Sequence, residues 1–229
     1  MTRARPMTWE EVAALDPIWL NLGGKSHCEP HPEYRGYVSV DVEPGEGWHV
    51  LHDLREPIPL PDASVDRVHT EDFLHYLTRP DMEKMLAECH RLLKPGGRLR
   101  VSLPDYGNPK DRSYFEAGSD SRHPRHLVLT DYVLMADILS CTPFSEVEFY
   151  HFWEGGAFVE RPFDEKLGTI QRVPGKDPRT RTDGVDWRWK LRNAAFHASR
   201  GWRVAPAERP FLRGDRLHVT SLVVDCFKA

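Results

Sequence analysis

The sequence contains no long hydrophobic run and few cysteines. No apolar stretch approaches the roughly 20 residues that a membrane-spanning helix needs, so we expect no membrane partner. The four cysteines among 229 residues have no paired spacing, which favours reduced thiols over a disulfide framework. The N-terminal stretch MTRARPMTWEE lacks the apolar core of a secretory signal. A cytoplasmic location is therefore the default expectation.

A surplus of positive charge is also missing. The formal net charge is −4, whereas proteins that bind nucleic acid usually carry a basic excess, so a nucleic-acid partner is not expected. The local exception is the segment 172–203, which is rich in arginine and tryptophan. We interpret it as a solvated insertion held by aromatic anchors, with an RNA-binding surface as the alternative.

Short β-branched runs alternate with helical or connecting segments along the chain. Strands are expected at 18–22, 37–42, 48–54, 65–72, 98–105, 145–153 and 216–228. Helices are expected after the capping box Thr8–Glu11 and at 80–93 and 130–139. This order predicts an α/β fold, a three-layer αβα sandwich on a mainly parallel sheet. The connection 43–47 is too short for a crossover helix, so the pairing of its two strands stays open.

The length fits one domain, 1–229, with an irregular insertion at about 155–214. The stretch 155–214 is assigned to the insertion because it shows little periodicity.

Several segments together resemble the Rossmann-like, class I S-adenosylmethionine (SAM)-dependent methyltransferases, and most closely small bacterial members of that family. They are LNLGG (20–24), VSVDV (38–42), HDLREPIPLPDASVDRVHTEDFLHYL (52–77) and LAECHRLLKPGGRLRVSLPD (86–105). The resemblance implies a Rossmann-like sheet of seven strands whose last strand is antiparallel. It also implies that the KPGG turn and Asp66 are architectural.

The resemblance further implies a set of cofactor-binding residues. Gly23 and Gly24 stand where the family's glycine-rich turn approaches the cofactor, although no third glycine follows. Asp41 stands where a carboxylate accepts hydrogen bonds from both ribose hydroxyls, with a surface acid as the alternative. Asp53 takes the position that meets the adenine amine, beside Leu54, with a turn-capping acid as its alternative.

The loop after the fourth strand departs from the family pattern. Thr70 and Glu71 begin it, followed by Asp72, where relatives often carry Ser-His. These positions usually face the methionine end of the cofactor and the acceptor. The acids are interpreted as ligands for the cofactor's amino group or for a cationic acceptor, or as caps of the following helix.

Candidate catalytic residues follow the fifth strand. His126 is the first choice as general base, and Asp105 and Tyr106 are candidates to orient the acceptor or take its proton. Both of the latter also suit an ordinary turn. The weaker candidates are His123, His151 and Glu154.

The cluster HCEPH, 27–31, has the residue types of a metal site. It lacks an evident fourth ligand, so we predict no metal and give Cys28 no nucleophilic role.

The function implied by the resemblance is SAM-dependent methyl transfer to a small molecule. Two alternatives remain: a non-catalytic SAM- or nucleoside-binding module, and an enzyme of the same fold that uses another part of SAM. The acceptor and the oligomeric state are not readable from the sequence.

Overall fold

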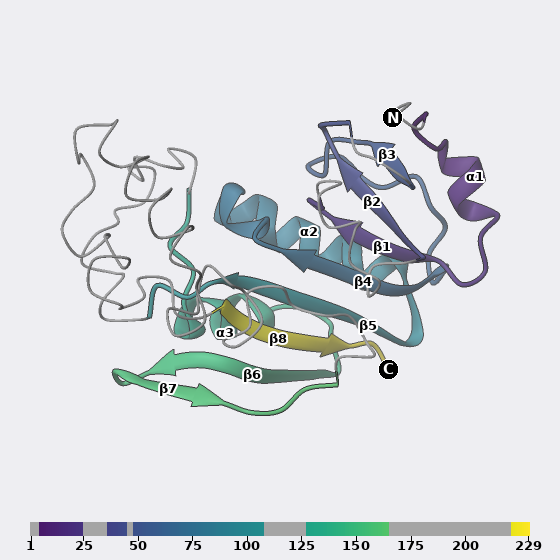
Figure 1. Ribbon diagram of the computed structural model, residues 1–229. Coiled ribbons are helices and arrows are strands. Elements are labelled where there is room, and N and C mark those ends of the chain that lie inside the picture. The colour runs from purple at the N-terminus through teal and green to yellow at the C-terminus, as the bar shows by residue number, and fades with distance from the viewer. Residues whose placement is uncertain (1–4, 25–35, 45–47, 108–126, 165–220) are drawn as a thin grey trace, which may run out of the picture.

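The computed structural model describes residues 5–24, 36–44, 48–107, 127–164 and 221–229 (Figure 1). Its strands are β1 (Trp19–Leu22), β2 (Tyr37–Asp41), β3 (His49–Leu51), β4 (Val65–Glu71), β5 (Leu93–Pro104), β6 (Glu146–Glu154), β7 (Ala157–Glu160) and β8 (Ser221–Phe227). Its helices are α1 (Trp9–Ala13), α2 (Arg79–Leu92) and α3 (Tyr132–Ser140), with a 3-10 turn, η3 (Leu74–Tyr76). None of the helices in these ranges is long and apolar enough to cross a membrane.

The strands of the described residues form one sheet in the order β3-β2-β1-β4-β5-β8-β6-β7. Strands β1 to β5 pair in parallel, and β8 is antiparallel to both of its neighbours, β5 and β6. The expected Rossmann-like sheet with an antiparallel last strand is therefore confirmed.

The sheet has one strand more than the seven expected, because β7 lies inside the segment expected to be irregular. Gly155 and Gly156 have φ values of +58° and +82° and join β6 to β7. Two residues with positive φ are what a tight hairpin turn requires, and glycine reaches this region without steric cost. The pair Gly155-Gly156 between two short strand-forming runs is thus a hairpin signal in the sequence.

Strands β2 and β3 are parallel despite their short connection, with Ser39 opposite His49 and Asp41 opposite Leu51. The expected strand 48–54 is shorter in the structure, because only His49–Leu51 pair. A strand of three residues spans only about 10 Å, so the chain can return along it without a crossover helix. The open question about this pairing is settled by the length of β3.

One face of the sheet is apolar except at Thr70, which lies opposite Leu22 and Val101. In Figure 1, α2 and α3 lie behind the sheet on this side. Successive residues of a strand point to opposite faces, and the apolar residues of this face are almost completely buried. They are Leu20, Leu22, Val38, Val40, Val68, Leu99, Val101, Leu103, Leu222 and Val224. Both helices and these strands belong to one hydrophobic core.

The opposite face buries charged side chains. Arg100 and Asp225 stand opposite each other on β5 and β8 and form a two-pronged ion pair, with both donor–acceptor distances at 2.7 Å. The neighbouring Arg98 approaches the same carboxylate at 3.3 Å. The ring of Phe163 lies 4.7 Å from the Arg100 guanidinium carbon, and the Asp164 carbonyl accepts a bond of 2.8 Å from Arg100 Nη1. The chain after β7 is thus fastened to this face.

The architectural expectations for α2 and the KPGG turn are confirmed with small shifts in boundaries. Gly96 has φ of +74°, and a Cβ at Gly97 would lie 2.7 Å from the Lys94 carbonyl oxygen. The KPGG residues are counted within β5, which begins at Leu93. Asp66 accepts hydrogen bonds from the Ile18 amide and the Lys94 ammonium, so it joins β1 to the end of α2. Its role is structural, as expected.

Candidate functional site

The carboxyl ends of three parallel strands meet at one place on the sheet edge. Leu22, near the end of β1, lies between Val40 of β2 and Thr70 of β4. From β1 the strand order runs outward through β2 to β3 on one side and through β4 to β5 on the other. Such a switch in direction leaves a crevice beyond the carboxyl ends, where open α/β sheets bind their ligands.

The glycine turn after β1 is required by the packing of the protein itself. Gly23 has φ of +69°, and its amide donates to the Val40 carbonyl over 2.9 Å. A Cβ at Gly23 would lie 2.2 Å from Phe73 Cγ, and one at Gly24 would lie 2.1 Å from the Asn21 side-chain nitrogen. A side chain at Gly23 would be strained by its positive φ and would displace Phe73, and one at Gly24 would displace the Asn21 side chain, even before a ligand is considered. Their cofactor-binding role stays a prediction.

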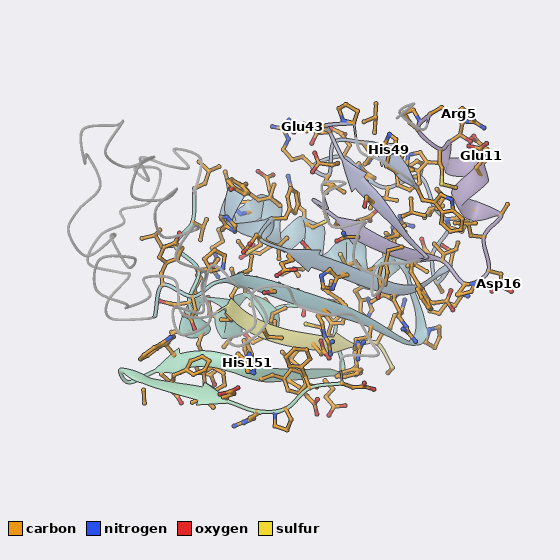
Figure 2. The ribbon with its side chains drawn as sticks, in the orientation of Figure 1. Arg5, Glu11, Asp16, Glu43, His49 and His151 are labelled. Carbon is orange, nitrogen blue, oxygen red and sulfur yellow. The ribbon has the colours of Figure 1, made fainter. Side chains whose placement is uncertain are left out.

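Asp41 ends β2 with part of its carboxylate available. Its Oδ1 accepts a bond of 2.9 Å from the Glu43 amide, and no donor among the described residues contacts Oδ2. Glu43, labelled in Figure 2, lies beyond the end of β2. The intervening Val42 exposes 64% of its surface. An acceptor oxygen and an apolar side chain therefore stand side by side at this end of the sheet.

Asp53 lies in the turn just after β3, one residue beyond His52, whose amide donates to the Asp41 carbonyl over 3.0 Å. The Arg55 guanidinium holds both carboxylate oxygens of Asp53, and this ion pair lowers the pKa of Asp53 to about 2. Leu54 is buried, with 6% of its surface exposed. The two acids that the resemblance implied are thus brought together on adjacent strand ends.

Thr70 and Glu71 end β4 on the other side of β1. The Thr70 hydroxyl is buried and has no hydrogen-bond partner within the part of the chain that the structure describes. Glu71 is half-buried. Asp72 follows with φ of +54°, uncommon for a residue other than glycine, and its amide donates to the Ser102 carbonyl over 2.9 Å. Unusual backbone at a strand end is frequent in binding sites.

Asp105 and Tyr106 follow β5 and are both buried. The Asp105 carboxylate accepts the amide of Gly107 at 2.9 Å on Oδ1 and that of Trp153 at 2.7 Å on Oδ2. Burial raises the pKa of Asp105 to about 6 despite these donors. Tyr106 is 1% exposed, and its amide donates to the Thr130 carbonyl. These contacts tie the end of β5 to β6 and to the start of α3, so the geometry gives both residues a structural role first.

The remaining candidates are separated from the switch point or lie outside the described residues. His126, His123 and the HCEPH segment fall in ranges that the structure does not describe. His151 is 3% exposed in β6, its pKa is lowered by burial, and its ring contacts Phe158 and Phe163 (Figure 2). Glu154 is exposed at the end of β6. The structure therefore unites the proposed cofactor residues better than the proposed catalytic ones.

Comparison with known proteins agrees with this geometry. Residues 36–101, from the start of β2 to the middle of β5, match the family described as "Methyltransferase domain". Over residues 36–101 the chain is similar to this family, and its sheet has the Rossmann-like strand order. The matched range includes Asp41, Asp53, Thr70 and the KPGG turn, but stops before Asp105.

Two curated proteins are similar to parts of this chain. A "Probable S-adenosylmethionine-dependent methyltransferase" of Mycolicibacterium smegmatis is 30% identical over 125 residues, which are 54% of this chain and 42% of that protein. An uncharacterized protein in a transposon of Streptomyces fradiae is 38% identical over 68 residues, 30% of this chain and 17% of that protein. The chain thus spans less than half the length of the curated relatives it matches.

Solved structures show the same fold. A SAM-dependent methyltransferase from Archaeoglobus fulgidus superposes with a TM-score of 0.56 at 15% identity, covering 93% of this chain and 86% of that one. Phosphoethanolamine N-methyltransferase 2 of Haemonchus contortus, in complex with S-adenosyl-L-methionine, gives 0.53 at 15% identity, covering 96% and 52%.

Three residues at this candidate site were missed from the sequence. Val42 directly follows Asp41, Arg55 directly follows the Asp53–Leu54 pair, and Phe73 packs on Gly23. Adjacency to a predicted ligand residue was the available signal for Val42 and Arg55. The contact of Phe73 joins two loops 50 residues apart and has no sequence signal.

Proposed function

We propose that the protein is a SAM-dependent methyltransferase that acts on a small-molecule acceptor. The observation that carries this proposal is the row of ligand-type groups at the switch point. Asp41, Asp53 and Thr70 stand at the carboxyl ends of β2, β3 and β4, on both sides of the glycine turn after β1. This is the edge at which a nucleoside-containing ligand fits an open α/β sheet.

The Asp41 carboxylate suits the ribose of such a ligand. Its Oδ1 is already engaged by the Glu43 amide, which fixes the orientation of the group. Its Oδ2 has no donor among the described residues. Asp41 itself is half-buried. Two ribose hydroxyls can donate to one carboxylate, and bonds to a charged acceptor are the stronger kind.

Apolar and acidic groups nearby suit the adenine ring. Val42 offers an exposed apolar surface, and Asp53 supplies an acceptor for the exocyclic amine. The Leu54 side chain is buried, so the proposed contact of Leu54 with the ring is through its backbone. A base that packs on an apolar side chain and donates to a carboxylate is held in a defined orientation.

The β4 end suits the amino-acid part of SAM. Burying a hydroxyl without a partner costs about 1–3 kcal/mol, so the lone Thr70 hydroxyl favours a ligand that supplies the missing bond. Glu71, the last residue of β4, adds a carboxylate at the same strand end for an ammonium group. SAM supplies a methyl group on a positively charged sulfur, which makes the carbon electrophilic.

The chain's own contribution to catalysis is chiefly positioning. An acceptor atom held in line with the methyl carbon, in a site from which water is excluded, reacts without an obligatory catalytic residue. Asp105 and Tyr106 are proposed to shape the acceptor side through the contacts of the β5 end with β6. If the acceptor must lose a proton, His126 is the proposed base.

A cytoplasmic location is part of the proposal. Cys89, Cys141 and Cys226 are free thiols in the structure, which suits a reducing compartment. Fractionation of cells that express the tagged full chain tests this, since recovery outside the cytoplasmic fraction would contradict it.

The test is calorimetric titration with SAM and with its demethylated product, S-adenosylhomocysteine. The wild-type protein should bind both ligands. Asp41→Ala should weaken binding at least tenfold, or about 1.4 kcal/mol, because the ribose hydroxyls lose their acceptor. Asp137→Ala, which removes an exposed acid of α3, is the matched control and should leave binding unchanged. Failure of the wild-type protein to bind either ligand would refute the proposal.

A second measurement separates an enzyme from a binding module. Incubation with methyl-labelled SAM and a panel of small amines, phenols and thiols should transfer label to at least one class. Binding without any transfer, together with retention of an RNA or protein partner by the 172–203 segment, would favour the non-catalytic alternative.

A further inference from the structure

We propose that Arg55 is the positioning residue of the adenine subsite: it fixes the Asp53 carboxylate so that one acceptor direction remains for the exocyclic amine of the base. This inference rests on the proposed function, because it assumes that a nucleoside binds beside Asp53.

Arg55 donates hydrogen bonds to the Asp53 carboxylate from both its main chain and its side chain. The Arg55 amide donates to Asp53 Oδ1 at 3.0 Å, and Nε donates to the same oxygen at 2.9 Å. Nη2 donates to Oδ2 at 2.5 Å, with a longer contact of 3.2 Å from Nε. A planar fork on a carboxylate fixes the plane of the group as well as its position.

These bonds determine how many lone-pair directions of the Asp53 carboxylate remain for a ligand donor. An ionised carboxylate has about four lone-pair directions over its two oxygens. Both directions of Oδ1 are taken by the Arg55 amide and Nε, and one direction of Oδ2 by Nη2. Within the described parts of the chain a single direction on Oδ2 is left, which matches one N–H of an amine. The lowered pKa of Asp53 keeps it a charged acceptor throughout the neutral range.

The fork is not needed to hold the turn. The Glu56 amide donates to the Asp53 carbonyl over 2.9 Å and closes this turn through the backbone. The side chains are open to solvent, 64% exposed for Arg55 and 36% for Asp53, and exposed ion pairs add little to stability. The fork stands instead at the sheet edge beside the acid proposed for the ribose, where the direction of an acceptor matters for a ligand.

The consequence is selectivity for a 6-amino purine over a 6-oxo purine. An amine donates to the remaining Oδ2 direction, whereas a carbonyl oxygen would face a fixed acceptor. Sites built to bond a donor reject ligands that lack it far more strongly than apolar sites do. Loss of Arg55 leaves the Asp53 carboxylate free to rotate and so reduces the preference for the 6-amino over the 6-oxo purine.

The experiment compares S-adenosylhomocysteine with S-inosylhomocysteine on four proteins: wild type, Arg55→Ala, Arg55→Lys and the control Arg79→Ala. Arg79 is a matched control because it is also an exposed arginine in ion pairs, with Glu83 and Asp137 rather than with the Asp53 of the proposed adenine subsite. Dissociation constants come from calorimetry, and thermal unfolding checks that all four proteins are equally folded.

The expected result is a change in preference rather than a uniform loss. Arg55→Ala should weaken the adenosyl ligand about three- to tenfold and leave the inosyl ligand unchanged or slightly tighter, because only the amine uses the fixed carboxylate. Arg55→Lys keeps the charge without the fork and should retain only part of the preference. Arg79→Ala should match wild type. In an Asp53→Asn background, Arg55→Ala should have no further effect on the ratio.

Two outcomes would overturn the inference alone. Equal weakening of both ligands by Arg55→Ala would assign Arg55 a merely structural role, and tighter binding of the adenosyl ligand would make it a competitor of the amine. Absence of binding to the wild-type protein would refute the proposed function and this inference with it.

Discussion

Aspartates in two regions of the sheet, the β2–β3 edge and the interior strands β5 and β8, have opposite surroundings. Asp41 and Asp53, after β2 and β3, are partly open to solvent. Asp105, after β5, is 2% exposed, and Asp225 in β8 is fully buried. The first pair can be reached from solvent, although Arg55 holds both oxygens of Asp53. The second pair is buried and bonded to amides or arginines. Access to solvent, rather than residue type or the number of occupied lone pairs, separates the acids proposed to bind a ligand from the structural ones.

The most damaging change on the buried side should be Asp225→Ala. It leaves the guanidinium groups of Arg98 and Arg100 buried without this counter-charge, and breaking one partner of a buried pair costs about 3–5 kcal/mol. Urea unfolding measures the free energy. The control is Asp137→Ala, because that acid is 58% exposed and its loss should have little effect. A loss for Asp225→Ala as small as the control's would show that the pair is dispensable.

Removing both partners sharpens the same test. Arg100→Met with Asp225→Leu replaces the charged pair by apolar side chains, which is often close to neutral for stability. The double variant should therefore be more stable than Asp225→Ala alone. A double variant that unfolds as readily as the single one would instead point to Arg98, which loses Asp225 in both variants, or to the contacts of Arg100 with Asp164 and Phe163.

The next largest effect is expected at Asp105. Asp105→Ala leaves the Gly107 and Trp153 amides without their acceptor and should cost about 2–4 kcal/mol, since each buried unpaired amide costs about 1–3. Asn retains one acceptor oxygen, so Asp105→Asn should cost less. Urea unfolding gives the stability, and SAM titration of the folded variants gives binding. A stable but inactive Asp105→Ala would restore the catalytic interpretation of this acid.

The pH dependence of stability provides an independent test of the raised pKa of Asp105. Burial raises its pKa to about 6 in the folded protein, against about 3.9 in the unfolded chain. The folded state therefore holds the proton longer, and this contribution to stability is complete below about pH 4 and lost as pH rises through about 6. Relative to Asp105→Asn, the wild type should lose roughly 2–3 kcal/mol between pH 4 and 7. A flat difference between the two curves would contradict the raised pKa.

Local patterns made much of the fold predictable. The capping box at Thr8 and Glu11 forms both of its bonds, and α2 begins and ends within one residue of the expected bounds. These features depend on neighbours in the chain, which periodicity and capping rules describe well. The strands β1, β2, β4 and β8 likewise fall where β-branched runs predict them.

Long-range pairings set the limit of prediction. Arg100 and Asp225 are 125 residues apart, and only the register of β5 with β8 brings them together. An arginine and an aspartate each alternating with apolar residues look like surface positions in the sequence, whereas the structure buries both. The site shows the same limit, because the resemblance placed Asp41 and Asp53 but could not reveal that Arg55 occupies most of the Asp53 carboxylate.

The smallest effect on stability is expected at Asp53, on the open side of the comparison. Its depressed pKa of about 2 means that its contribution to stability is present above the unfolded value of about 3.9 and lost as pH falls through about 2. Because the side chain is 36% exposed, solvent screens the pair, and Asp53→Asn should leave the urea midpoint at pH 7 unchanged. The chemical shift of the Asp53 carboxyl carbon should nevertheless report a pKa that moves up toward its ordinary value in Arg55→Ala. A urea midpoint that Asp53→Asn leaves nearly unchanged would fit an exposed acid available to a ligand, whereas a clear drop in the midpoint would place Asp53 with the structural acids.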